Sequence, residues 1–208
     1  MYPLIFAGLL SMSVATPRLA QINPVNAVRI YENARQELQE VKQEREEYLM
    51  QVKEQVQTRI EAHRAEIEKV ANERLRNRLT EMTNRFVSIN GKWTSHWTDV
   101  LNRLDTILTK IEANSSELAA SEVDTTLLDA AIDDAHAAID AATQSVQDLA
   151  SKEYIYNIDD EATVGENVRE EISLFKTDME TVRADVTAAR ESVQEAFSQL
   201  RVLTSENE

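Results

Sequence analysis

Apolar residues recur at spacings of three and four along residues 75–111, which is the pattern of one buried stripe on an α-helix. The stripe, called the seam below, consists of Leu75, Leu79, Met82, Phe86, Ile89, Trp93, Trp97, Val100, Leu104, Ile107 and Ile111. It predicts a helix over about 75–113. Two spacings of four adjoin between Ile89 and Trp97, around Gly91, and such a stutter locally unwinds heptad packing. The stutter indicates either a hinge or binding notch, or a position where the glycine makes room for a neighbouring side chain.

Two further stretches show the same helical period and predict helices over about 124–150 and 163–204. Alanine takes several apolar positions in the first of them, so a close helix approach is expected on that face. Three helices in succession, joined by short connections, predict an antiparallel three-helix bundle over residues 75–205. Its core is expected to contain Leu79, Phe86, Trp93, Val100, Ile107, Ile132, Ile139, Phe175 and Val182.

Residues 24–74 favour a long N-terminal helix with a thin apolar stripe. The segment is rich in Glu, Gln, Lys, Arg and Ala, which are strong helix formers, and Asn23-Pro24 is a helix-entry signal. Arg45 stands where the next apolar residue after Val41 is expected. A helix running on into the seam would be longer than any compact domain of this chain, so we expect a coiled-coil-like stalk that projects from the bundle. The stalk either pairs with another chain or is a solvated single helix.

Residues 151–162 interrupt the helical pattern with an aromatic and β-branched run. Tyr154 and Tyr156 lie in it. We expect a partner protein to bind at this linker or at the region around the seam's two tryptophans. The candidate interaction residues are therefore Trp93, Trp97, Tyr154 and Tyr156.

Composition supports the all-α prediction and excludes several chemistries. The 208 residues include only three Gly, three Pro and no Cys. Three glycines cannot build a phosphate-binding loop, and the three His residues are not spaced as a zinc site needs. The acidic run Asp159-Asp160-Glu161 lacks the spacing and glycine of a calcium loop. We therefore expect no enzyme activity, no metal and no cofactor.

The net charge of −15 is concentrated in the C-terminal half. Residues 112–208 carry 23 acidic and 6 basic side chains, whereas residues 24–76 are close to neutral. An acidic surface repels phosphate backbones, so nucleic acid is an improbable partner.

The N-terminus begins with a short apolar run, residues 2–10, followed by small residues. This pattern predicts a secretory signal peptide within residues 1–20, cleaved after Ala15 or Ala20. The run is too short to span a bilayer as a stable helix. No Lys or Arg precedes it, and membrane attachment is expected only if the segment stays uncleaved. The alternative is a cytoplasmic protein.

The C-terminal two-thirds resembles a group of uncharacterised secreted helical-bundle proteins of candidate-phylum bacteria. The resemblance covers residues 75–203 and is carried by the succession RLTEMTNRF, ILTKIEAN, VDTTLLDAAIDDAHAAIDAATQ, SKEYIYNID and VREEISLFKTDMETVRADVTAARESVQEAF. It implies a signal peptide, an envelope or extracellular location, and no assigned activity. The charged stalk and the tryptophan pair depart from the pattern of that group.

Together these features predict a non-enzymatic structural or protein-interaction protein outside the cytoplasm, in the periplasm, on the envelope or secreted. It would act as a spacer or scaffold, and its partner would be another protein or a second copy joined through the stalk. The alternative is an envelope holdase-type chaperone that grips unfolded clients with its long helices.

Overall fold

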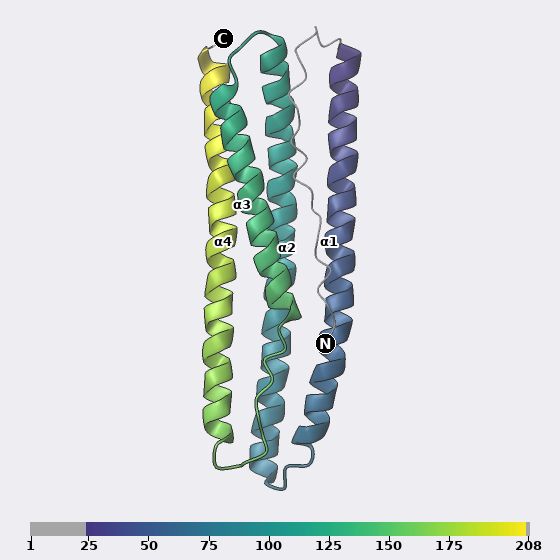
Figure 1. Cartoon of the computed structure of the whole chain (residues 1–208), viewed down its shortest axis with the longest axis vertical. Helices are drawn as coiled ribbons and strands as arrows, with labels where there is room; N and C mark the ends of the chain where they lie inside the picture. Colours follow the sequence, from purple (N-terminus) through teal and green to yellow (C-terminus); the bar gives the residue numbers. More distant parts are fainter. Residues whose placement is uncertain (1–23, 207–208) are drawn as a thin grey trace, which may run out of the picture.

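The computed structural model describes residues 24–206 as four helices: α1 (Pro24–Ile67), α2 (Glu73–Ala120), α3 (Thr126–Ser151) and α4 (Val164–Glu206). No strand occurs among these residues. The helices lie side by side in one elongated rod, with α1 and α3 running in one direction and α2 and α4 in the other (Figure 1). At about 1.5 Å per residue, the 48 residues of α2 span about 70 Å. The prediction of an all-α helical bundle is confirmed.

The first helix differs from the prediction. The chain leaves α1 at Ile67, turns within residues 68–72 and re-enters a helix at Glu73. Asn72 is the N-cap of α2, and its Oδ1 accepts a hydrogen bond from the backbone N of Leu75 at 3.2 Å. Such a cap satisfies one of the free N–H groups at a helix start and stabilises the break. Instead of projecting as a stalk, α1 therefore lies back along α2 (Figure 1).

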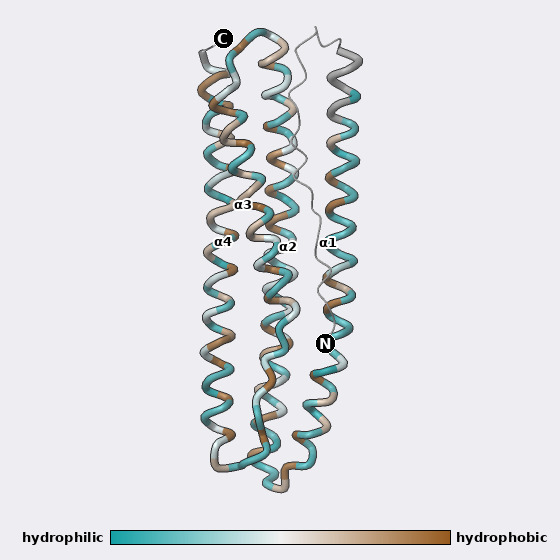
Figure 2. The backbone as a smooth tube through the Cα atoms, viewed as in Figure 1, coloured by the Kyte–Doolittle hydropathy of each residue, from teal (hydrophilic) through white to brown (hydrophobic). Residues whose placement is uncertain are grey.

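The three helices α2, α3 and α4 share a continuous apolar core. Small residues bring α3 and α4 together: Ala135 and Ala142 of α3 and Ala189 and Ala196 of α4 are completely buried. Figure 2 shows that hydrophilic residues dominate α1, in line with its thin apolar stripe. Its described apolar side chains are buried at only three positions, Val52, Ile60 and Ile67. The core thus belongs mainly to three helices; α1 adds Ile67 to it and otherwise lies against its outside.

The buried face of α2 is rotated away from the predicted seam. Leu101 and Leu108 are fully buried, whereas their neighbours Val100 and Ile107 lie at the edge or outside, with Ile107 44% exposed. Trp93, also expected in the core, is 43% exposed. The reason is α1, because it covers the side of α2 that carries polar residues and so shifts the buried arc towards them. The other predicted core residues, Leu79, Phe86, Ile132, Ile139, Phe175 and Val182, are buried.

The helix ends follow the prediction closely in α3 and α4, but α2 runs on to Ala120 instead of ending near residue 113. Ser115 explains the extension, since its hydroxyl is buried and donates a hydrogen bond to Asp129 Oδ1 of α3 at 2.7 Å. Helix α2 is also continuous through Gly91. A Cβ placed on Gly91 would meet nothing within 4 Å, so the glycine makes room for no neighbour.

Helix α3 is the shortest, and the linker that follows it completes its path along the rod. Residues 152–163 run beside the lower half of α2 to reach the start of α4 (Figure 1). Tyr156 anchors the linker, because its hydroxyl donates to the carbonyl O of Leu79 at 2.7 Å and lies 2.9 Å from Thr83 Oγ1. Tyr154 packs between the rings of Phe86 and Phe175, with centroids 5.8 and 4.7 Å away.

Candidate functional site

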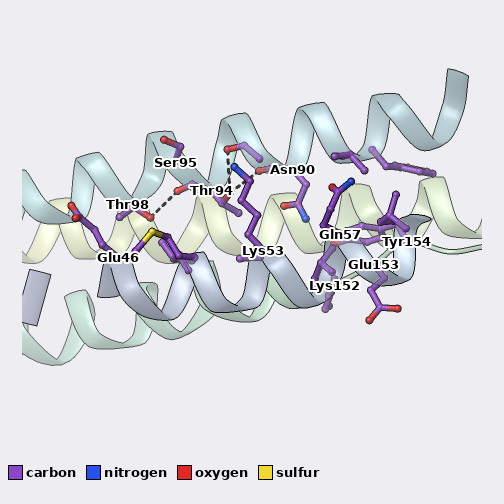
Figure 3. Close-up of a pocket in the computed structure, with 18 of the residues that line it drawn as sticks. Glu46, Lys53, Gln57, Asn90, Thr94, Ser95, Thr98, Lys152, Glu153 and Tyr154 are labelled. Carbon is purple, nitrogen blue, oxygen red and sulfur yellow. Dashed lines mark hydrogen bonds between the residues drawn. The ribbon is translucent and has the colours of Figure 1, made fainter. Parts of the chain in front are cut away.

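A cavity of about 330 Å³ opens between α1 and α2, at the level where α3 gives way to the linker (Figure 3). Helix α1 contributes one wall and α2 the other. The end of α3 and the first linker residues close one end. The lining residues are Glu46, Leu49, Met50, Lys53, Val56, Gln57, Ile60, Phe86, Val87, Asn90, Gly91, Thr94, Ser95, Thr98, Asp99, Asn102, Ala150, Lys152, Glu153 and Tyr154.

The α2 wall is a row of small polar residues spaced four apart, so that they share one helix face. Asn90 is 8% exposed; its Nδ2 donates to the carbonyl O of Leu149 at 3.1 Å, and its Oδ1 has no hydrogen-bond partner. The hydroxyls of Thr94 and Thr98 donate to carbonyl groups one turn earlier, at 2.9 and 2.8 Å. Because both threonine hydroxyls already donate their hydrogen bonds within the helix, the wall offers mainly acceptor oxygens to the cavity.

The α1 wall is apolar with one cation. Leu49, Met50, Val56 and Ile60 provide the apolar surface. Lys53 extends from α1 across the cavity towards the wall that holds Asn90 and Thr94 (Figure 3). None of the ion pairs of the described residues includes Lys53. The cavity therefore combines apolar walls, a cation and an unpaired buried amide oxygen, a combination that suits binding of a small amphiphilic group.

Above the cavity, polar side chains join α1 to α2 in what we term the upper cluster. Arg45 NH1 donates to Asn102 Oδ1 at 2.7 Å and to Asp105 Oδ2 at 3.1 Å, and Lys42 Nζ donates to Thr106 Oγ1 at 2.9 Å. The side chains of Arg45 and Asp105 are 6% and 11% exposed. Burial raises the pKa of Asp105, and the charge of Arg45 only partly offsets this. The Nε of Arg45 has no partner.

Below the cavity, a lower cluster joins α1 to the linker. Arg59 forms an ion pair with Glu153, and the His63 ring meets the Tyr156 ring edge-on with centroids 4.8 Å apart. His63 is buried, which lowers its pKa, although nearby Glu66 acts in the opposite direction. Helix α1 is therefore held at two levels by mostly polar contacts, with the cavity between them.

The four candidate interaction residues from the sequence occupy different environments. Trp93 is 43% exposed and lies against Trp97, with ring centroids 5.2 Å apart. Trp97, Tyr154 and Tyr156 are 5%, 7% and 3% exposed, so these three are core residues and present little surface to a partner. The Tyr154 hydroxyl donates to Asp178 Oδ2 at 2.9 Å, and burial, with that carboxylate, raises its pKa strongly. The cavity could not be predicted from the sequence, since the residues on its walls belong to two helices whose pairing was not predicted.

Two further findings concern residues 24–206 only. No group of three or more His, Cys, Asp or Glu side chains in this part of the chain could hold a metal ion. None of the four helices is both long and apolar enough to cross a membrane. The predicted signal peptide, residues 1–20, lies outside the described residues.

Comparison with known proteins adds no relative to this picture. No family model matches the chain, and neither a curated protein nor a solved structure matches it. The fold and its surfaces are therefore the basis for the function proposed below.

Proposed function

We propose that this protein is a non-enzymatic scaffold or spacer of the cell envelope or exterior that works through protein contacts along its length. The observation that carries the proposal is the way α1 is attached. Helix α1 is 44 residues long, yet it rests on the core through two polar clusters and three buried apolar side chains. Hydrogen bonds contribute about 1 kcal/mol each, or about 1.5–3 kcal/mol where a charged group takes part, so a partner helix that offers equivalent polar groups can replace these contacts.

The location outside the cytoplasm is part of the same proposal and rests on the N-terminal apolar run and on the resemblance to secreted helical-bundle proteins. Its test is the N-terminus of the protein isolated from its source cells. A chain that begins at Thr16 or Gln21, found in the envelope or the medium, supports the proposal. A chain that keeps residues 1–15 and fractionates with the cytoplasm refutes it.

The scaffold role is tested by cross-linking in the source cells. A photoreactive amino acid is placed at exposed sites along the rod, one variant at a time. Discrete adducts with one protein, or with a second copy of this chain, support a scaffold. An absence of adducts at every site, in a strain where the tagged protein is present at its normal level, refutes it.

The second candidate function is a holdase, favoured by the large apolar side chains that remain on the surface. Met50, Trp93 and Phe197 are 64%, 43% and 48% exposed. Suppression of the aggregation of an unfolded model client at equimolar ratio would support this alternative. No suppression, together with discrete cross-links, would leave the scaffold as the explanation.

A further inference from the structure

The face that α2 and α4 expose side by side, called the groove below, is a second surface, separate from the cavity and from α1. The two helices run in parallel, and the rings of Phe86 and Phe175 meet between them with centroids 5.3 Å apart. In Figure 1, α3 crosses in front of this pair, so the face that α3 leaves uncovered is the opposite one. Half-exposed apolar side chains form its floor: Ile89, Trp93 and Ile107 of α2 and Phe197 of α4 are 39% to 48% exposed.

The contacts of α4 show which residues border the groove. Asp178 binds the linker through Tyr154 Oη and Lys152 Nζ, and Asp185 accepts a hydrogen bond from Ser145 of α3, so this edge of α4 faces α3. Residues five further along lie about 140° around the helix, at 100° per residue. Arg183 and Arg190 therefore occupy the opposite edge, which borders the groove. Both are exposed.

The same reasoning applies to α2. Thr83 contacts Tyr156 of the linker and Asn90 contacts Leu149 of α3, so this edge of α2 faces α3. Arg78 and Arg85 precede them by five residues and occupy the edge on the α4 side. The groove thus has a basic residue row on each border.

Each row continues along its helix at a spacing of seven, with a single step of eleven. The α2 row is Arg78, Arg85, Lys92, Arg103 and Lys110, and the α4 row is Arg169, Lys176, Arg183, Arg190 and Arg201. All ten side chains are exposed, and none takes part in an ion pair of the described residues. Two facing rows of one sign are unusual, since neighbouring helices usually pair opposite charges at such positions.

No carboxylate lies on the floor or in the α4 row, although the whole chain carries 37 acidic residues. The step of eleven in the α2 row passes over one carboxylate, Asp99, which stands seven residues after Lys92. Further carboxylates stand immediately outside the rows, at positions such as Glu81 and Glu180. The positive strip is therefore only about one helix wide. We call this strip, with its apolar floor, the cationic groove.

We propose that the cationic groove binds an acidic amphipathic α-helix of a partner protein. The apolar stripe of that helix would cover Trp93 and its neighbours, and its Glu or Asp side chains would face the two basic rows. From Arg78 to Lys110 the groove accommodates about 48 Å of helix, or about 32 residues. This inference rests on the proposed role as a protein-interaction scaffold and names the surface and the partner chemistry.

The observations favour a partner helix over the other occupants. A flat anionic bilayer is wider than the strip and would also meet the carboxylates outside the rows. A second copy offers no matching helix: α1 carries both signs of charge, and the apolar stripe of α3 is already buried against α2 and α4.

The experiment uses the full purified chain and two synthetic peptides of about four heptads, with Leu at the core positions. One peptide has Glu at its flanking positions and the other has Lys. Binding of the Glu peptide should shift the tryptophan emission to the blue, because Trp93 becomes covered, and should be measurable by calorimetry. The affinity should fall at least about tenfold between about 50 and 500 mM salt. The Lys peptide should not bind.

Two matched double variants test the location. Lys92→Glu with Arg183→Glu reverses one residue of each row beside Trp93 and should weaken Glu-peptide binding at least about tenfold. Arg29→Glu with Arg35→Glu reverses two exposed cations of α1 and should leave the affinity unchanged within about twofold. All four side chains are exposed, and unchanged circular dichroism and an unchanged urea unfolding midpoint would show that the fold is retained.

Several outcomes would overturn the assignment. These are no binding of the Glu peptide at millimolar concentration, equal binding of both peptides, or equal binding by both double variants. Sedimentation with vesicles of phosphatidylglycerol that only the groove variant loses would assign the groove to a bilayer. Self-association that only the groove variant loses would assign it to a second copy. Discrete cross-links elsewhere on the rod would still support the scaffold role if the groove assignment fails.

Discussion

Removing the Asp105 carboxylate should loosen α1 more than the core. Arg45 is 6% exposed and donates from a single nitrogen, NH1, to Asn102 and Asp105. In Asp105→Asn the guanidinium stays buried with no counter-charge. Breaking a buried pair in this way typically costs about 3–5 kcal/mol. Because Asn102 still accepts a hydrogen bond from NH1 and α1 can move outward to hydrate Arg45, we expect a smaller loss of stability, about 2–3 kcal/mol.

Amide hydrogen exchange resolves where that free energy is lost. The protection of α1 amides near Arg45 should fall about 30- to 150-fold, since 1.4 kcal/mol corresponds to a factor of ten. Amides at the centre of α4, far from the pair, should change much less. Glu117→Gln, which removes an exposed carboxylate from the same helix away from the cavity, is the matched control and should leave exchange unaltered.

The double variant Arg45→Met with Asp105→Leu replaces both members of the pair with apolar side chains. Burial already opposes ionisation of Asp105 by raising its pKa, and Arg45 Nε has no partner. An apolar pair should therefore be as stable as the wild-type protein or more so. The reasoning is refuted if Asp105→Asn costs less than about 0.5 kcal/mol, or if the double variant is less stable than the single one.

Three further predictions concern α2 and the lower cluster. Trp97→Ala should lower the free energy of unfolding, measured with urea, by about 3–5 kcal/mol. Trp93→Ala should lower it by no more than about 1.5 kcal/mol, since only Trp97 is buried. Equal losses would contradict the assigned burial. Gly91→Ala should stabilise the protein by about 0.5–1 kcal/mol, because the position is helical and open; a loss of stability would show a hidden contact. Burial lowers the pKa of His63 below 6.5, so the α1 contact should be strongest above that pH and weaken as pH falls towards the lowered value. Amide exchange at the end of α1 measures this effect, and His63→Phe should abolish it; an unchanged pH profile in that variant would assign the dependence to another group.

The sequence was sufficient for the helical class and for most of the core, because the three-and-four spacing of apolar residues survives in every helix of the bundle. It was insufficient where two rotations of a helix fit the apolar pattern equally well. Val100 and Leu101, like Ile107 and Leu108, are adjacent apolar residues, so one rotation of the helix buries the first of each pair and another the second. Only the position of α1 decides between them.

The reversal after α1 was missed for a different reason. Asn72 is a good N-cap, but it stands within a run of strong helix formers, and one capping residue does not outweigh them in a local pattern. Tertiary contacts decide: Arg45 and His63 find partners only when α1 folds back. The basic rows are visible in the sequence as repeats of seven. That both rows border the same groove follows only from the orientation of each helix, which the contacts of Asp178 and Asn90 establish.

The antiparallel order of four helices has a mechanical consequence. The first residue of α1 and the last residue of α4 lie at the same end of the rod (Figure 1). A tension applied between these two ends would peel α1 from the core one contact at a time, beginning at the upper cluster and reaching His63 last. Such unzipping needs less force than sliding whole helices past each other. The three-helix core would stay intact while α1 is drawn out, so the rod could lengthen under load and recover when released.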